Sequence, residues 1–446
     1  MTSDAPVSPA IPLPPPPAFT GQLPTDHKGL QHYADQLDRF LSQLPSRPAR
    51  DTEQTDRAAA LHEARRTARH SFLARHAPQV YDVLTDGGTL QLRLPDLVRQ
   101  AQTHFPGLVP TAAQLADERG HIQADKEGYE IDLGIFFGAL LRSPTAGAHL
   151  IATMLHPAPG SLALLDTFRR QDLLELETVV VERRGPAAHV TFHNHHCLNA
   201  EDNQLIADLE TAVDLTLLDD RVRVGVLRGG QVDHPRYAGR RVFSAGINLK
   251  DLRNGSISYL DFLLGRELGY VNKLAHGLLT SDPGWRQPAA VHKPWVAAVD
   301  AFAIGGGMQL LLVVDRVLAE EGAYFSLPAA EEGIVPGLSN LRLPRFTGAR
   351  MARQVLLCGR RLRAGEAGTE LLCDEVVPAD RLTDAVERAV TELAGPAAAA
   401  NRAMLALADE PWDLLRRYLA DFAVVQAERI YSADVLARIE QRWARP

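Results

Sequence analysis

The segment KPWVAAVDAFAIGGGMQLLLVVD, residues 293–315, decides the fold class of this 446-residue chain. Its first part, PWVAAVD, is a short apolar run that predicts a buried β-strand. A glycine triplet at residues 305–307 follows, and the apolar run MQLLLVVD after it predicts a helix. Because glycine triplets also serve turns and close helix packing, the meaning of this one depends on the sequence around it.

The surrounding sequence alternates between strand and helix patterns. TVVVER and HVTFHN are β-branched runs separated by an Arg-Gly-Pro turn at residues 184–186, which predicts a hairpin. The next predicted elements are a helix at about residues 201–218, a strand at VRVGVLR and a strand near AYFSL. Such alternation predicts an α/β fold with a layered core.

Helical patterns flank this core on both sides. The proline-rich residues 1–25 are predicted to be disordered or extended, because proline lacks an amide donor and fixes its own torsion. Residues 26–175 repeat apolar side chains at three- and four-residue spacing and predict an all-helical N-terminal domain. The predicted catalytic core spans residues 176–395. Residues 396–446 predict a helical C-terminal segment that packs between subunits.

The composition is that of an ordinary globular protein, with 46% apolar and 23% charged residues. A formal net charge of -8 argues against general nucleic-acid binding, and no apolar run reaches membrane-spanning length. The start of the chain lacks the positive charge of a signal or transit peptide, so we expect a cytoplasmic protein. The three cysteines, Cys197, Cys358 and Cys373, are widely spaced and predict reduced thiols.

Two segments together, RRVFSAGINLKDL at residues 240–252 and the glycine-triplet segment, resemble the crotonase, or enoyl-CoA hydratase/isomerase, superfamily. The resemblance implies a crotonase-like spiral core of ββα units that binds an acyl-coenzyme A thioester. It assigns the two amides of an oxyanion hole to Ile247 and Gly306. Two fixed amides near a helix N-terminus stabilise the charge that a thioester enolate carries on oxygen, and glycine at 306 lets the backbone approach the ligand.

The acids that hydratases of this superfamily use are missing. By resemblance their positions hold Gln309 and Ala329, and neither an amide nor a methyl group can act as a general acid or base. Simple hydration is therefore not expected. Glu331 and Glu332 lie nearby in the sequence, at positions that other members use for a different base, so isomerase, hydrolase or decarboxylase chemistry stays open.

AGINLKDL, GRELGYVNKL, GGGMQ and the long helical N-terminal extension resemble one branch of the superfamily, the cofactor-independent dioxygenases of glycopeptide-antibiotic biosynthesis. That resemblance implies conversion of 3,5-dihydroxyphenylacetyl-CoA and dioxygen to 3,5-dihydroxyphenylglyoxylate and free coenzyme A. No metal or flavin is expected, and the sequence has no Rossmann glycine fingerprint. The alternative is an iron site at HNHH, where His193 and His195 would share one face of a strand.

The same resemblance gives roles to three polar residues. Glu201 and Gln309 are predicted to bind the ring hydroxyls, and Arg266 is predicted to orient the acyl group or balance its charge. Two of them have simpler readings: Glu201 starts a predicted helix, where a carboxylate interacts favourably with the helix dipole, and Arg266 also fits a solvated surface position.

Recognition of coenzyme A is expected, again by resemblance, near the first oxyanion segment. The predicted contacts are the backbone from Ala245 to Asn248, the side chain of Lys250, and the imidazoles of His195 and His234; Lys250 also fits an ordinary exposed lysine. Dioxygen is apolar and is expected in a dry pocket lined by residues such as Leu249 and Ile334.

Three functions thus remain after the sequence is read. The favoured one is the dioxygenase; the second is another acyl-CoA reaction, such as thioester hydrolysis or isomerisation driven by Glu331 or Glu332; the third is a binding protein without catalysis. The superfamily also implies a homo-oligomer, either a trimer or a dimer of trimers.

Overall fold

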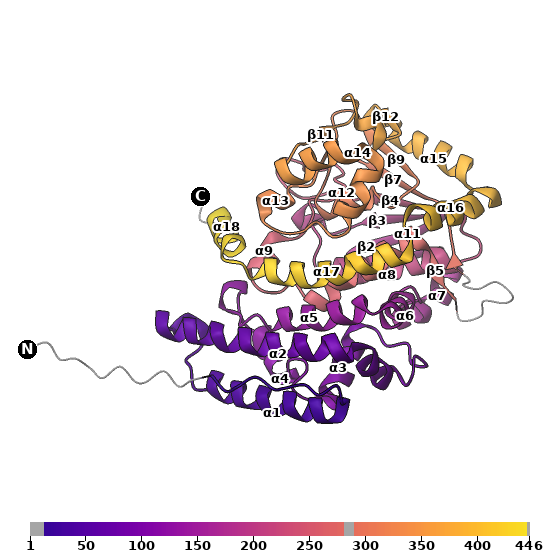
Figure 1. The fold of residues 1–446 in the computed structure, drawn as a ribbon. Coiled ribbons are helices and arrows are strands. Elements are labelled where there is room, and N and C mark those ends of the chain that lie inside the picture. The colour runs from indigo at the N-terminus through magenta and orange to yellow at the C-terminus, as the bar shows by residue number, and fades with distance from the viewer. Residues whose placement is uncertain (1–12, 281–289, 444–446) are drawn as a thin grey trace, which may run out of the picture.

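The computed structural model describes residues 13–280 and 290–443 (Figure 1). Before the first strand the chain forms a layer of helices: α1 (Leu23–Leu41), α2 (Thr52–Thr85), α3 (Leu94–His104), α4 (Ala112–Glu118), α5 (Tyr129–Arg142), α6 (Pro144–Met154) and α7 (Pro159–Gln171). The first helix starts with Pro24 in its first turn, where a missing amide costs nothing, so the predicted extended start ends earlier than residue 25. Residues 1–12, which that prediction also covers, lie outside the described residues.

A seven-stranded sheet with the order β1-β2-β3-β4-β7-β9-β12 forms the centre of the core. The first three strands are antiparallel, which confirms the predicted hairpin, and the strands from β3 onward are parallel. Their bounds are β1 (Leu173–Glu175), β2 (Val179–Arg184), β3 (Ala187–Phe192), β4 (Val224–Gly229), β7 (Trp295–Val299), β9 (Arg316–Glu320) and β12 (Glu375–Val377). Every residue of β7 is buried, as expected for a central parallel strand covered on both faces.

Short strands and helices surround this sheet and carry the candidate site. A second sheet has the order β11-β10-β8, and β5 pairs with β6. The remaining strands are β5 (Leu278–Leu279), β6 (Ala290–Val291), β8 (Phe302–Ile304), β10 (Tyr324–Ser326) and β11 (Leu362–Arg363). The helices of the core are α8 (Asn203–Leu218), α9 (Leu249–Arg253), the π-helix η4 (Tyr259–Leu264), α10 (Gly265–Leu268), α11 (Tyr270–His276), α12 (Gly306–Leu310) and α13 (Ala329–Glu332). Single 3-10 turns occur at η1 (Arg47–Ala49), η2 (Gln123–Asp125), η3 (His195–Cys197), η5 (Thr369–Leu371) and η6 (Ala379–Arg381).

The helix predicted after the glycine triplet is shorter than its apolar run. It ends at Leu310, because Asp315 is held beside the central strand. The Asp315 amide donates to the carbonyl oxygen of Trp295, and the Asp315 carboxylate accepts from the Trp295 amide at 2.7 Å. The chain therefore turns at once into β9, a strand that the periodicity did not reveal.

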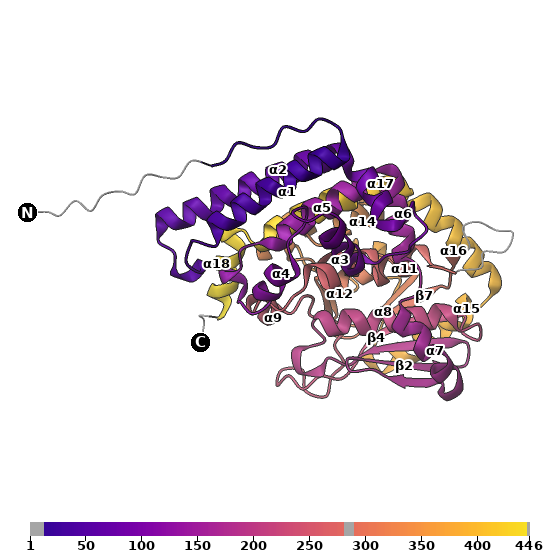
Figure 2. The same cartoon turned by 90° about the horizontal axis from the view of Figure 1, so that it is seen from below.

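The C-terminal helices pack inside the same chain: α14 (Ser339–Cys358), α15 (Leu382–Leu393), α16 (Pro396–Asp409), α17 (Trp412–Ile430) and α18 (Ala433–Trp443). Both Figure 1 and Figure 2 show α17 running beside α5, between the helical layer and the core. Side chains at Gly134 or Gly138 would lie 2.7 and 2.9 Å from α17 carbonyl oxygens, so glycine permits this close contact. Among the described residues no single helix is long and apolar enough to span a bilayer, although the bent pair Tyr129–Arg142 and Pro144–Gln171 together meets the length and composition test.

Candidate active site

Two short β-bridges bring the predicted oxyanion segments together. Ser244 pairs in parallel with Ala303, and Glu201 pairs in parallel with Ile247. Three residues on from the Ser244–Ala303 pair lie Ile247 and Gly306, the two predicted amide donors. Within the described chain neither of these amides donates a hydrogen bond to a protein acceptor, so both are available to a ligand.

Glycine is needed on both sides of this arrangement. Gly246 and Gly305 have φ values of +80° and +53°, which residues with a side chain rarely adopt. A Cβ atom on Gly246 would lie 2.9 Å from the carbonyl oxygen of Ile304. A Cβ atom on Gly306 would lie only 1.7 Å from Oε2 of Glu201, so the carboxylate occupies the space that the missing side chain leaves.

A cavity of about 790 Å³ opens beside the two amides. Its walls come from the oxyanion segments, from η4 and α10, from α12 and α13, and from the C-terminal helices α17 and α18. The predicted site residues that line it are Glu201, His234, Ala245, Ile247, Leu249, Arg266, Gly306, Gln309 and Ile334. The structure therefore gathers most of the predicted side chains around one space.

Three predicted coenzyme A contacts are not among the described lining residues. The side chain of Asn248 caps α9 by accepting from the amides of Lys250 and Asp251, and Lys250 itself is exposed. The imidazole of His195 lies 3.4 Å from the carboxylate of Asp233 on an exposed turn. Local capping and pairing thus account for the positions of the Asn248 and His195 side chains.

The polar end of the cavity is built around the buried guanidinium of Arg266. It donates to Oε1 of Glu201 at 2.9 Å and to the carbonyl oxygen of Gly306 at 2.9 Å. Its other arm donates to Oε1 of Glu267 at 2.7 Å and to Oε1 of Gln309 at 2.9 Å. The solvated position is wrong for Arg266, which is 3% exposed. Glu201 is 2% exposed and pairs with Arg266, and its position beside the start of α8 also permits the interaction with the helix dipole.

Glu267 and Tyr270 belong to this cluster, although neither was predicted. Glu267 also accepts from the amide of Leu338, which ties α10 to the turn after α13. The Tyr270 hydroxyl donates to Oε1 of Glu201 at 3.3 Å, and its ring lies 5.5 Å from the guanidinium of Arg266. The available signal was position: Glu267 adjoins Arg266, and Tyr270 lies four residues further on, within the conspicuous GRELGY stretch.

Ionisation in this cluster follows from burial and pairing. Burial alone would lower the pKa of the Arg266 guanidinium, but the neighbouring charge of Glu201 raises that pKa above its ordinary value. Burial raises the pKa of the Tyr270 hydroxyl well above its ordinary range. Arg266 is thus a permanent cation that two carboxylates share, and Tyr270 is a permanent hydrogen-bond donor.

Each of two side chains in the cluster has one polar atom left over. The hydrogen bonds to Glu201 all reach Oε1, and among the described residues none reaches Oε2. The Gln309 oxygen faces Arg266, which can only donate, so the Gln309 amide nitrogen is the end that remains. The cluster therefore offers a ligand one strong acceptor and one neutral donor.

The outer part of the cavity has an aromatic and cationic wall. The ring of Phe302 lies 5.3 Å from that of Tyr237 and 5.5 Å from that of Tyr324. The exposed guanidinium groups of Arg236 and Arg361 lie over the Tyr237 and Tyr324 rings at 5.6 and 5.4 Å. Flat rings suit the base of a nucleotide, and exposed guanidinium groups suit its phosphates.

Ala329, at the second hydratase-acid position, lies on a short helix in the cavity wall. Ala329 begins α13 and lines the cavity with Glu331 and Glu332, which lie on the same short helix. Arg438 of α18 donates to the backbone carbonyls of Ala330 and Glu331, so the C-terminal helix holds α13 in place.

No group of three or more metal-ligand side chains with suitable geometry occurs among the described residues, the HNHH segment included.

A crotonase-type core, two free amides at a glycine-lined turn and a large adjoining cavity define a protein of the acyl-thioester-binding crotonase class. The enoyl-CoA hydratase/isomerase family model matches residues 182–420, more than half of the chain. The chain belongs to the enoyl-CoA hydratase/isomerase family. The structure of Pseudomonas aeruginosa OdaA has the same fold, with a TM-score of 0.50 at 23% identity over 60% of this chain and 100% of that one.

Relatives within the family differ in how much of the chain they share. A probable enoyl-CoA hydratase of Rhizobium meliloti strain 1021 is 31% identical over 222 residues, 50% of this chain and 77% of that protein. A (3,5-dihydroxyphenyl)acetyl-CoA 1,2-dioxygenase of Amycolatopsis orientalis is 53% identical over 414 residues, 93% of this chain and 95% of that protein. The second similarity necessarily includes most of the N-terminal helices, which precede the residues matched by the family model.

Proposed function

We propose that this chain is a cofactor-independent dioxygenase that converts 3,5-dihydroxyphenylacetyl-CoA and dioxygen to 3,5-dihydroxyphenylglyoxylate and free coenzyme A. The observation that carries the proposal is the cluster around Arg266, which fills the acyl end of the cavity with hydrogen-bonding groups that suit a polar aromatic ring. The near full-length similarity to the dioxygenase of Amycolatopsis orientalis supports the same substrate.

The ring hydroxyls of the substrate would complete the cluster. One phenol hydroxyl donates to Oε2 of Glu201, the atom that receives no hydrogen bond from a described residue. The second accepts from the amide nitrogen of Gln309, whose oxygen is held by Arg266. A glutamate at position 309, as in the hydratases, would add a third carboxylate beside Glu201 and Glu267, which explains why an amide suits this site better.

The thioester carbonyl would then lie between the amides of Ile247 and Gly306. Loss of one Cα proton gives an enolate whose charge these amides stabilise, and the aryl ring delocalises it further. The enolate transfers one electron to dioxygen, and the resulting superoxide combines with the carbon radical to form a peroxide at Cα. The outer peroxide oxygen attacks the thioester carbonyl and expels the coenzyme A thiolate; loss of the second Cα proton with cleavage of the O–O bond then yields the keto acid.

These steps balance without an added reductant. One aryl-acetyl thioester and one dioxygen give one aryl-glyoxylate and one thiol, and all the electrons come from the substrate. For the dioxygen we propose the apolar part of the cavity, which includes Leu249, Phe262 and Ile334. For the nucleotide of coenzyme A we propose the aromatic and cationic wall, with Arg236 and Arg361 facing the phosphates.

Association of several copies is also part of the proposal. Met404, Leu405 and Leu407 on α16 are each more than half exposed, which is unusual for adjacent large apolar side chains. Such a face supports a homo-oligomer, either a trimer or a dimer of trimers as the superfamily implies. The molar mass in solution, measured by light scattering, tests it.

An oxygen electrode tests the reaction. Protein dialysed against a chelator is expected to consume one dioxygen for each coenzyme A released from 3,5-dihydroxyphenylacetyl-CoA. Release of coenzyme A without oxygen uptake would mean hydrolysis, for which Glu331 or Glu332 in the cavity wall is the expected base. Uptake that appears only after a metal is restored would overturn cofactor independence, and the absence of any turnover would favour a binding protein.

A further inference from the structure

One continuous segment of the chain, residues 247–267, begins and ends in the candidate active site. It starts at the amide of Ile247, continues through α9 and a loop, enters the π-helix η4, and ends at Arg266 and Glu267. We call it the active-site segment. Because the segment supplies both an oxyanion donor and the central cation, a shift of its middle part that reaches either end moves one of these groups relative to the other.

The middle of the active-site segment is held by the N-terminal helical layer. Lys126 is 3% exposed and donates from Nζ to the carbonyl oxygen of Gly255 at 2.7 Å. Glu130 accepts from the amide of Tyr259 at 2.9 Å, through Oε1. The contact is tight, since a Cβ atom on Gly255 would lie 2.2 Å from the carbonyl oxygen of His121.

Helix α17 forms hydrogen bonds with the same two residues, Tyr259 and Glu130. The hydroxyl of Tyr259 donates to the carbonyl oxygen of Ala423 at 2.8 Å, and the hydroxyl of Tyr431 donates to Oε2 of Glu130 at 2.7 Å. Phe422 and Gln426 of this helix line the cavity. Each carboxylate oxygen of Glu130 thus has one donor, one from the active-site segment and one from the end of α17.

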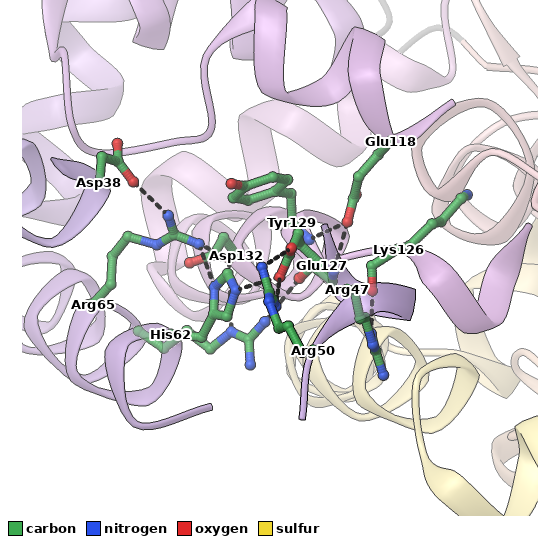
Figure 3. A network of polar contacts seen from close by, with 12 residues as sticks. Asp38, Arg47, Arg50, His62, Arg65, Glu118, Lys126, Glu127, Tyr129 and Asp132 are labelled. Carbon is green, nitrogen blue, oxygen red and sulfur yellow. Dashed lines mark hydrogen bonds and ion pairs between the residues drawn. The ribbon is translucent and has the colours of Figure 1, made fainter. Parts of the chain in front are cut away.

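Lys126 and Glu130 lie on residues 118–130, which run from the end of α4 to the first turn of α5 and which we call the support loop. A network of buried and partly buried polar side chains fixes that loop (Figure 3). Oε1 of Glu118 accepts from the amides of Gly128 and Tyr129. Figure 3 also shows Glu127 held by Arg50 and His62. Its Oε1 accepts from Arg50 at 2.5 Å, and its Oε2 lies 3.0 Å from Nε2 of His62. A loop held at several points is rigid enough to fix the position of what it contacts.

We propose that Lys126 and Glu130 are positioning residues for the reaction, and that the N-terminal helical layer serves to hold the active-site segment in its productive geometry. Neither side chain lines the cavity, so both act through Gly255 and Tyr259. The expected loss of reaction rate rests on the proposed function, whereas the expected loosening of the active-site segment does not. It gives the extension, which lies outside the family model, a role in catalysis.

The test compares variants that remove or keep the acceptor at residue 130. Glu130→Leu removes both hydrogen bonds, whereas Glu130→Gln keeps an oxygen for the Tyr259 amide and a donor for the Tyr431 hydroxyl. Lys126→Met removes the ammonium with little change in length. The matched control is Arg93→Leu, because Arg93 also joins the helical layer to the core, through Glu210 at 2.6 Å, and lies outside the described cavity lining.

Two rates are measured for each variant: anaerobic exchange of the substrate Cα proton with deuterated solvent, and aerobic oxygen uptake. Glu130→Leu and Lys126→Met are expected to lower kcat for both between about 10- and 100-fold, with a smaller change in KM, as misplacement by about 1 Å does. Glu130→Gln and Arg93→Leu are expected to stay within about threefold of the unmodified protein, since the one keeps the acceptor and the other spares the segment.

The inference is overturned if folded Glu130→Leu exchanges the substrate Cα proton as fast as the unmodified protein. It is also overturned if kcat of Glu130→Gln or of the Arg93→Leu control falls as much as kcat of Glu130→Leu. A readout independent of turnover is backbone hydrogen exchange, in which peptides from residues 247–267 are expected to exchange faster in Glu130→Leu than in Glu130→Gln. Equal exchange would refute the positioning role. If the unmodified protein neither exchanges the proton nor takes up oxygen, the proposed function fails, and hydrogen exchange still decides the positioning role.

Discussion

Two buried clusters of arginine and carboxylate side chains can be compared, one in the cavity and one in the helical layer. The cavity cluster centres on Arg266 with Glu201 and Glu267. In the helical layer Asp132 has no exposed side-chain surface and pairs with Arg69 at 2.6 Å, and Arg65 joins it to Asp38. Both clusters are almost fully buried, so burial and pairing alone do not distinguish a site from a structural brace.

The difference between the clusters lies in what their polar atoms face. In the helical layer Oδ1 of Asp132 faces Arg69 and Oδ2 faces Arg65 and Arg66, so both carboxylate oxygens are occupied by cations. In the cavity Oε2 of Glu201 and the amide nitrogen of Gln309 remain for a ligand, beside two free backbone amides. Unused hydrogen-bonding capacity next to a cavity is thus the better mark of function.

The largest effect is expected from closing the space that the cavity cluster uses. Gly306→Ala would place a methyl group against Oε2 of Glu201, displacing the carboxylate or the amide. Because the loss of one oxyanion-hole donor costs about 100- to 1,000-fold, kcat/KM for oxygen uptake is expected to fall at least that far. Gly160→Ala is the control, since nothing lies within 4 Å of its added methyl. A Gly306→Ala protein with normal turnover would remove Gly306 from the oxyanion hole.

A matched pair of arginine variants tests directly whether only the cavity cluster is needed for activity. Arg266→Met leaves Glu201 and Glu267 without their cation and is expected to lose about 3–5 kcal/mol of unfolding free energy. Arg69→Met removes the nearest of the three cations around Asp132 and is expected to lose less, because Arg65 and Arg66 remain. Only Arg266→Met is expected to lower kcat as well, by at least about 100-fold, because only Arg266 orients ligand-facing groups.

Denaturant unfolding and oxygen uptake below the transition separate these outcomes. Should Arg69→Met lose activity to the same extent while still folded, the distinction between a closed and an open cluster would be wrong.

The sequence allowed the fold class and the oxyanion pair to be predicted, because short motifs carry them. Ile247, Gly306 and Gln309 each lie within a few residues of a glycine whose backbone requirement is local. The cluster of Glu267 and Tyr270 was missed because spacing alone does not show which face of a short helix meets the cavity. The role of Lys126 could not be predicted from the sequence, since its partner Gly255 lies 129 residues away and only tertiary packing brings the two together.

The aromatic and cationic wall offers a smaller, more specific effect. Arg361→Ala is expected to raise KM for the coenzyme A thioester roughly 10-fold and to leave kcat unchanged, as the loss of one hydrogen bond to a charged group does. The same variant is expected to leave KM unchanged for a truncated thioester that lacks the nucleotide. An equal rise in KM for both substrates would place Arg361 at the acyl group rather than at the phosphates.

The last expected effect is on stability alone and concerns Glu118, a buried carboxylate of the helical layer that forms no ion pair with a described residue. Glu118 accepts two amides through Oε1, whereas its buried Oε2 has no partner among the described atoms. Burial raises the pKa of this carboxyl from 4.5 to about 7, although the two amides act to lower it. Between these values the folded protein keeps a proton on Glu118 that the unfolded chain has lost, so the contribution of Glu118 to stability falls as pH rises from about 4.5 to 7 and changes no further above that.

Glu118→Gln removes this titration and keeps an oxygen that can accept from the amides of Gly128 and Tyr129. The difference in unfolding free energy between Glu118→Gln and the unmodified protein is therefore expected to shift in favour of the variant, by at most about 3 kcal/mol, as pH rises from 5 to 8. Denaturant unfolding at both pH values measures the shift, with Glu63→Gln, at an exposed carboxylate, as the control. A difference that does not change with pH would mean that Glu118 is ionised throughout, and that the helical-layer network is as fully matched in charge at Glu118 as it is at Asp132.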